Sequence, residues 1–103
     1  MSDFLDVPGV SGARYRFRRA DLHALPATAG NLLVVCLRKA GPELLLCAAA
    51  DSLAQAASGA AEALKARRGA VVYIRLNVAR AAREAEHADI AALAPEAVAG
   101  QIA

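Results

Sequence analysis

Two neighbouring strand-like runs constrain the fold of this chain most: NLLVVCLRK at residues 31–39 and PELLLCAAA at residues 42–50. The Gly41-Pro42 pair between them suits a tight hairpin turn. Alternation places apolar side chains on both faces of the hairpin, and each apolar face must be covered. We expect helices to cover one face, and a second subunit is the candidate cover for the other.

Both cysteines of the chain fall within this hairpin. If Gly41 and Pro42 are the central turn residues, Cys36 lies directly opposite Cys47. In the reducing cytoplasm that we expect for this chain, the two thiols are small apolar neighbours rather than a disulfide.

Other patterns predict the remaining elements. Residues 13–19 alternate, with Tyr15 and Phe17 inward and arginines outward, which predicts a half-buried edge strand. Residues 1–13 are rich in Gly, Ser and Pro and are expected to be irregular. After the hairpin we expect a helix over residues 52–68 that Asp51 caps and Gly59 can interrupt, a strand over residues 71–78, and a helix over residues 79–94 that Asn77 caps and Pro95 helps to stop.

This order of elements predicts an α+β fold in a single domain, residues 1–103, with its core in residues 13–95. The sheet is small, mainly antiparallel and of three to four strands, with two to three helices packed on one face. The composition is 57% hydrophobic but only 4% aromatic, so the core is built from Leu, Val and Ala. Such a chain carries more apolar surface than a monomer of its size can hide, which indicates a homodimer or another protein partner.

Bulk charge and segment patterns exclude several classes of protein. The net charge of +2 is too small to argue for nucleic-acid binding on its own. No apolar run reaches the roughly 18 residues of a membrane-spanning helix, and no secretory signal is visible. We therefore expect a cytoplasmic protein without a membrane segment.

Glu86 is the most informative candidate for a functional residue. At about 100° per residue, the last helix places a single stripe toward the sheet, consisting of Ala79, Ala82, Glu86, Ile90 and Leu93. A carboxylate there needs a cation or hydrogen-bond donors, because burying it unpaired is unfavourable. Glu86 is thus either a metal ligand or catalytic carboxylate, or the partner of Arg83 or Arg75 in a salt bridge.

Further candidates lie near Glu86 or on the arginine-rich strand. Arg83 and His87, four residues apart beside the stripe, either contact phosphate or form a solvated helix surface. A working enzyme would use Tyr73 together with these two residues and Glu86. In RYRFRR, the residues Arg14, Arg16, Arg18 and Arg19 are nucleic-acid-binding candidates, although the alternation alone explains arginines in water and aromatics inside.

The segment GAVVYIRLNVARAAREAEHADIAALAP resembles the end of small bacterial members of the GIY-YIG nuclease superfamily. The resemblance covers about residues 26–95: a hairpin, a helix, a strand introduced by Gly-Ala, and a helix with an inward Glu before a Pro. It implies a GIY-YIG-like fold, in which the helix glutamate binds the metal, here Glu86 with Mg²⁺. The alternative folds are another small α+β sandwich and a ferredoxin-like arrangement.

The other motifs of that family are altered. The first tripeptide falls at Gly30-Asn31-Leu32 and the second at Leu46-Cys47-Ala48, so both tyrosines are leucines. Ala54 and Ala56 stand where arginines are expected, and the asparagine after Pro95 is absent. A lone glutamate supports neither the nucleophile nor the developing charge of phosphodiester cleavage. We therefore expect a non-catalytic domain without a cofactor that serves protein interaction or assembly. The alternative is a metal-dependent nuclease or nucleic-acid-binding protein that acts through Glu86 and the arginine-rich strand.

Overall fold

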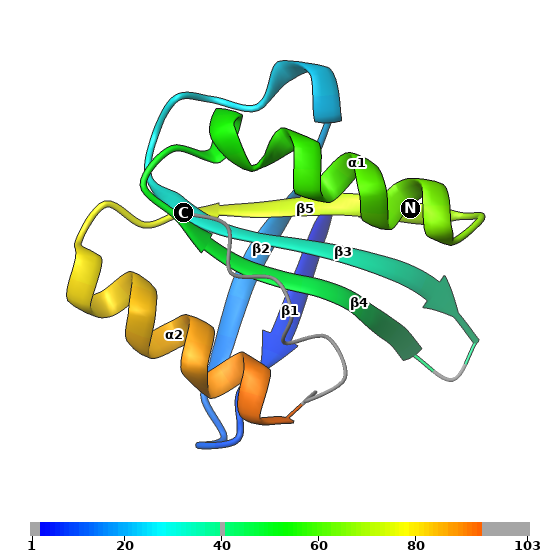
Figure 1. Ribbon diagram of the computed structural model, residues 1–103. Helices are drawn as coiled ribbons and strands as arrows, with labels where there is room; N and C mark the ends of the chain where they lie inside the picture. The colour runs from blue at the N-terminus through cyan, green and yellow to red at the C-terminus, as the bar shows by residue number, and fades with distance from the viewer. Residues whose placement is uncertain (1–2, 40, 94–103) are drawn as a thin grey trace.

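Five antiparallel strands form one sheet in the computed structural model, which describes residues 3–39 and 41–93 (Figure 1). The strands lie in the order β1-β2-β5-β3-β4. Their bounds are Phe4–Pro8 (β1), Arg14–Ala20 (β2), Gly30–Arg38 (β3), Gly41–Ala50 (β4) and Ala70–Leu76 (β5). The expected α+β class and antiparallel pairing are confirmed, but the prediction of three to four strands was too low.

The additional strand is β1, which lies where irregular structure was predicted. It pairs with β2 from Phe4 opposite Arg18 to Pro8 opposite Arg14, and Gly12 turns the chain with a φ of 93°. The Gly and Ser residues that suggested irregularity form the turn of this hairpin, while the short β1 precedes them. Because β2 lies between β1 and β5, the prediction that it is an edge strand was also wrong.

The β3–β4 hairpin has a different register from the expected one. Arg38 pairs with Gly41, so Gly41 begins β4 instead of lying at the centre of the turn. A bulge next to Val34 and Val35 shifts the register further. Cys36 therefore lies opposite Glu43, whereas Cys47 lies opposite Leu33. The predicted juxtaposition of the two cysteines was wrong.

The two faces of the sheet are covered by different helices (Figure 1). On one face, α1 (Ala57–Ala66) and the 3₁₀ turn before it (Leu53–Ala56) pack on Leu32, Val34 and Ile74. On the other face, α2 (Arg80–Leu93) contributes Ile90 to a second core, where the curled β1–β2 hairpin adds further side chains. The second core consists of Val7, Phe17, Leu33, Val35, Cys47, Tyr73 and Ile90. The prediction that all helices lie on one face was wrong, because α2 crosses to the face for which a second subunit was considered.

The beginning of the helix after β4 and its expected cap differ from the prediction. The segment after β4 begins with the 3₁₀ turn and becomes α-helical at Ala57, so the irregularity precedes Gly59. Asp51 does not cap this segment, because its carboxylate pairs with Arg83 of α2.

In β5, the alternation was predicted correctly: Val72 and Ile74 face α1, whereas Val71 and Tyr73 face α2. A 3₁₀ turn at Leu22–Ala24 occupies the connector between β2 and β3.

Candidate functional site

Glu86 forms an ion pair with Arg75 of the neighbouring strand β5. Arg75 Nε donates a hydrogen bond to Glu86 Oε1 at 2.7 Å, and the two side chains are 32% and 18% exposed, respectively. The same guanidinium lies over the ring of Tyr15, 5.7 Å from the ring centre. Of the interpretations drawn from the sequence, the salt bridge with Arg75 is the one present, and the salt bridge with Arg83 is not.

The buried face of α2 is centred about one residue away from the predicted stripe. Arg83 and His87 are buried at 4% and 6% exposure, whereas Ala82 and Leu93 are exposed. The interpretation of Arg83 and His87 as a solvated surface was therefore wrong. Because neither side chain is accessible, neither can contact a phosphate group while α2 stays packed.

Arg83 instead ties the beginning of α2 to the sheet. Its guanidinium donates to the main-chain carbonyls of Asn77 and Val78 at 3.2 and 3.0 Å and to Asp51 Oδ1 at 2.7 Å. The buried Asn31 donates to the carbonyl of Arg83 and accepts from Asn77. This network satisfies polar groups around the start of α2, which gives the arginine a structural role.

His87 contacts Cys47 across the second core. Its Nδ1 lies 3.4 Å from the Cys47 thiol. Burial lowers the pKa of His87 below its usual value and raises the pKa of Cys47 to about 12. Both groups are therefore uncharged near neutrality. A thiol with this pKa is a poor nucleophile, so the pair is part of the core rather than a catalytic dyad. Tyr73, another catalytic candidate, is 2% exposed in the same core.

A second polar cluster joins the β1–β2 hairpin to α2. Asp89 accepts hydrogen bonds from the hydroxyl of Tyr15 at 2.6 Å and from the hydroxyl and main-chain N–H of Ser11 at 2.7 and 2.9 Å. The bond from Tyr15, followed by those from Ser11, lowers the pKa of Asp89, and the bond to Asp89 raises the pKa of Tyr15. Sequence reasoning missed this cluster, because 74 residues separate Tyr15 from Asp89 and the pairing of β2 with β5 was not foreseen.

The side chains around Glu86 do not form a set of ligands that fits a divalent cation. The positively charged Arg75 already binds the carboxylate, and repulsion from it opposes a metal ion at the same oxygen. Within residues 3–39 and 41–93, no three His, Cys, Asp or Glu side chains are grouped closely enough to hold a metal ion.

The positions to which the sequence resemblance would assign the two GIY-YIG tripeptides lie in β3 and β4 of the sheet. Leu32 is buried on the face that α1 covers, and Leu46 packs against the same core. Gly30 lies so close to β5 that an added Cβ would be 2.4 Å from the carbonyl oxygen of Arg75. Ala56, for which the resemblance would lead one to expect an arginine, is fully buried. These positions therefore supply apolar packing and a close backbone approach.

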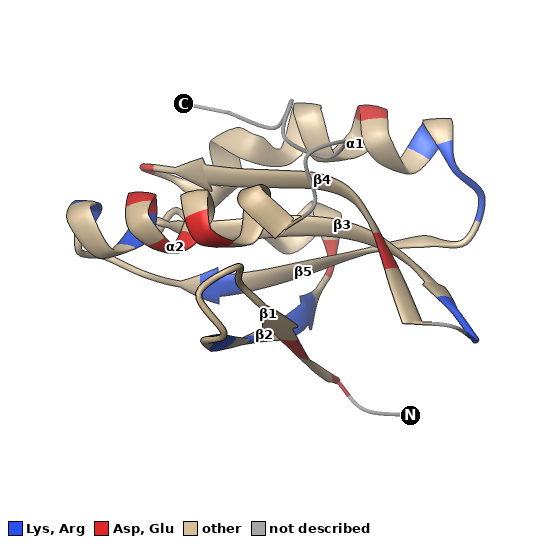
Figure 2. Ribbon diagram, turned by 90° about the horizontal axis from the view of Figure 1, so that it is seen from below, with Lys and Arg blue, Asp and Glu red and all other residues tan. Residues whose placement is uncertain are grey.

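The arginines of β2 are exposed as predicted. Figure 2 marks the basic segments of this strand, and Phe17, which stands among the arginines in the sequence, is buried. Arg16 pairs with Asp6 at 3.2 Å and lies over the ring of Phe4. No described carboxylate forms an ion pair with Arg14, Arg18 or Arg19.

No protein-family model, curated protein or solved structure matches this chain significantly. Among the described residues, no helix is both long enough and apolar enough to cross a membrane.

Proposed function

We propose that this chain is a non-catalytic, GIY-YIG-like domain that works as a protein-interaction or assembly module. The observation that carries the proposal is the ion pair between Arg75 and Glu86, which engages the carboxylate that metal binding would require. The order β4-β3-β5, with α1 before β5 and α2 after it, agrees with the layout on which the resemblance rests.

The side chains at the altered motif positions support the same conclusion. Leu32 and Leu46 carry no hydroxyl group that could position water, and Ala56 carries no guanidinium that could stabilise a phosphate. Positioned acid–base groups and charge stabilisers each contribute at least about 100-fold to such reactions. Freeing Glu86 from Arg75 would leave these functions missing.

A cleavage assay tests the absence of catalysis. The purified chain is incubated with branched, nicked and single-stranded DNA in the presence of Mg²⁺ or Mn²⁺. We expect no cleavage by the wild type or by Arg75→Met, which releases Glu86. Glu86→Gln is the matched control, since activity that persists in it comes from a contaminant. Metal-dependent cleavage that disappears in a folded Glu86→Gln variant would contradict the proposal.

Nucleic-acid binding without cleavage is a second candidate function, favoured by the exposed arginines of β2. If Arg14, Arg18 and Arg19 contact phosphates, the logarithm of the affinity should fall against the logarithm of salt concentration with a slope of about −2 to −3. Replacing all three arginines with glutamine should remove this dependence. A control with Arg67→Gln and Arg68→Gln changes arginines at the end of α1 instead. Equal weakening by both sets would show that binding follows the overall positive charge and is not specific to the arginines of β2.

A further inference from the structure

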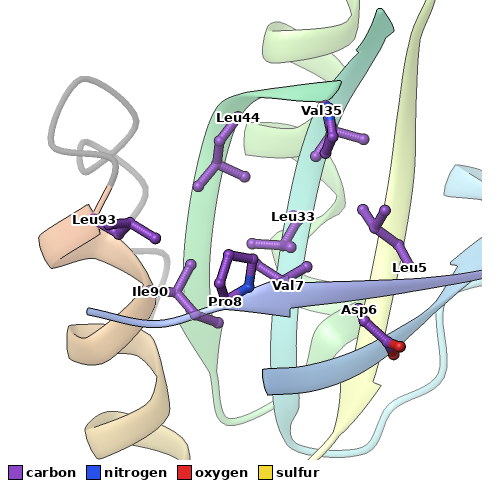
Figure 3. Close-up of a pocket in the computed structure, with 10 residues that line it drawn as sticks. Leu5, Asp6, Val7, Pro8, Leu33, Val35, Leu44, Ile90 and Leu93 are labelled. Atoms are coloured by element: carbon purple, nitrogen blue, oxygen red, sulfur yellow. The ribbon is translucent and has the colours of Figure 1, made fainter. Parts of the chain in front are cut away.

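Two recesses lie beside the short strand β1, on opposite faces of the sheet, and they differ in chemistry. The first is an apolar pocket of about 140 Å³ between β1, the β3–β4 hairpin and the end of α2 (Figure 3). Figure 3 shows Leu5 and Val7 on one side of β1 and the carboxylate of Asp6 on the other. Apart from Asp6, the residues that line this pocket are apolar, so it offers no partner to a charged ligand.

The second recess is a shallow hollow of about 160 Å³ over β1, β2 and the end of β5. The pairing of the strands places Phe4, Arg18 and Ile74 side by side in one row of this face. Asp6 and Arg16 form the next row. We name this recess the arginine hollow and define it by four of the residues that line it, Phe4, Arg16, Arg18 and Leu76.

Arg18 supplies the uncompensated positive charge of the arginine hollow. Arg16 pairs with Asp6 at 3.2 Å, and no described carboxylate forms an ion pair with Arg18. Arg14, also exposed and without such a partner, lies on the same face as Arg16 and Arg18, since the three are alternate residues of one strand. The arginines of this row stand about 6.8 Å apart along β2. A row of this kind attracts a ligand that carries several negative charges in a line.

The rest of the hollow is apolar and includes an accessible aromatic ring. Phe4 and Leu76 line it, and each is 51% exposed. The guanidinium of Arg16 lies over the Phe4 ring, 5.4 Å from its centre. Aromatic rings and guanidinium planes are the two kinds of protein surface on which unpaired bases stack. The hollow thus combines a charge partner for phosphates with a stacking surface for a base.

This combination favours a single nucleic-acid strand over other anionic partners. A duplex keeps its bases paired, so it could offer the arginines only its backbone and would leave the Phe4 ring unused. A membrane surface is approached by apolar side chains that project into it, whereas Phe4 and Leu76 line a recess between arginines.

We propose that the arginine hollow binds single-stranded nucleic acid, with one base against Phe4 and Leu76 and the phosphates along the arginines of β2. This inference rests on the second candidate function, nucleic-acid binding without cleavage, and deepens it by naming the form of the nucleic acid and the place where it binds. It assigns different roles to two adjacent arginines. Arg18 faces the hollow, whereas Arg19, opposite Tyr73, lies on the other face of the sheet.

Fluorescence anisotropy of a labelled oligothymidylate of about twelve nucleotides, titrated with the full chain at low salt, tests the proposal. Phe4→Ala should weaken binding at least about fivefold, because a stacked base contributes roughly 1–3 kcal/mol. Arg18→Gln should weaken binding and reduce the salt slope by about 0.7, the value for one phosphate contact with a single strand. A duplex of the same length should compete less well than the unlabelled single strand.

Matched variants and a matched ligand serve as controls. Leu93→Ala removes an apolar side chain that is also 51% exposed but lines the apolar pocket, so its affinity should equal that of the wild type. Arg19→Gln removes the same charge as Arg18→Gln and should weaken binding less. Inorganic polyphosphate carries the charge without bases, so Phe4→Ala should not change its affinity. Circular dichroism verifies that each variant is folded.

Asp6→Asn provides a test that misfolding cannot imitate. The substitution removes the carboxylate that competes with phosphates for Arg16, so affinity for the oligothymidylate should rise at least about twofold at low salt. An unchanged or lower affinity of this variant would count against the hollow as the binding site.

Two further results would overturn the proposal, and they differ in what else they reject. If the wild-type chain does not bind the oligothymidylate at low salt, even if it sediments with vesicles of anionic lipid, nucleic-acid binding as a function fails as well. If binding is present but folded Phe4→Ala and Arg18→Gln weaken it no more than Leu93→Ala and Arg19→Gln do, nucleic-acid binding stands and only the arginine hollow is rejected.

Discussion

Arg75 joins three elements through its contact with Glu86. Its Nε binds Glu86 Oε1 of α2 at 2.7 Å, and its Nη1 donates to the main-chain carbonyl of Arg16 in β2 at 3.3 Å. Since Arg75 itself belongs to β5, a single guanidinium holds the helix against two neighbouring strands. Glu86 is therefore one partner in a structural contact. Arg75, the other partner, contributes more to holding α2 against the strands than the carboxylate does.

The two ends of this pair should respond differently to substitution. Arg75→Met leaves a half-buried carboxylate without its donor and should lower the free energy of unfolding by about 1–2 kcal/mol. Glu86→Gln keeps a hydrogen-bond acceptor and should lower it by less than about 1 kcal/mol. Urea denaturation measures both. Arg80→Met, which removes the exposed pair with Glu84, is the control and should have almost no effect. A larger loss in Glu86→Gln than in Arg75→Met would contradict this account.

A similar asymmetry is expected for Arg83 and Asp51. Arg83→Ala leaves the carbonyls of Asn77 and Val78 without their donor and creates a void, so the free energy of unfolding should fall by about 2–3 kcal/mol. Asp51→Ala should lower it by less than about 1 kcal/mol, because the Asp51 side chain is 77% exposed. Denaturant midpoints of the two variants measure the two losses in the free energy of unfolding. Equal losses would show that the ion pair, rather than the carbonyl contacts, holds the beginning of α2.

These residues show how far the sequence predicts the structure. The alternation in β5 and the arginine face of β2 follow from local patterns, and both were predicted correctly. The orientation of α2 was predicted incorrectly, because the periodicity argument assigned Arg83 and His87 to the solvent. The long aliphatic part of an arginine can be buried when its guanidinium finds carbonyls, and those carbonyls come from residues whose position depends on the fold. The short strand β1 was not predicted, because its pairing with β2, and not its composition, makes it a strand.

The buried imidazole of His87 should make stability depend on pH. Burial lowers its native pKa below the ordinary value of 6.5, so the unfolded chain binds a proton more readily. The contribution to stability is complete above about pH 6.5 and is lost as the pH falls from there toward the native pKa. We expect the free energy of unfolding to decrease between about pH 7 and pH 5. His87→Gln should show a smaller decrease, with His23 present in both proteins as an internal control. Identical pH profiles would reject this role for His87.

The two thiols should differ in reactivity. Cys47 is 1% exposed and has a pKa of about 12, whereas Cys36 is partly exposed. Under native conditions at neutral pH, iodoacetamide should modify Cys36 first, and Cys47 should react only when the chain unfolds. Mass spectrometry after timed labelling, with a sample in denaturant as the reference, measures the two rates. Rapid native labelling of Cys47 would show that α2 leaves the sheet easily.

The order of the strands also affects how the chain is made. Because β5 lies between β2 and β3, the amino-terminal hairpin cannot join the β3–β4 hairpin until residues 70–76 have been synthesised. During translation, the two hairpins therefore remain separate, with unpaired strand edges and uncovered aliphatic faces. The arrival of one strand then joins them in a single step that depends on contacts distant in sequence. Until that step, the nascent chain is exposed to aggregation, so a rare-codon pause just before residue 70 should lower the soluble yield more than one just after α2.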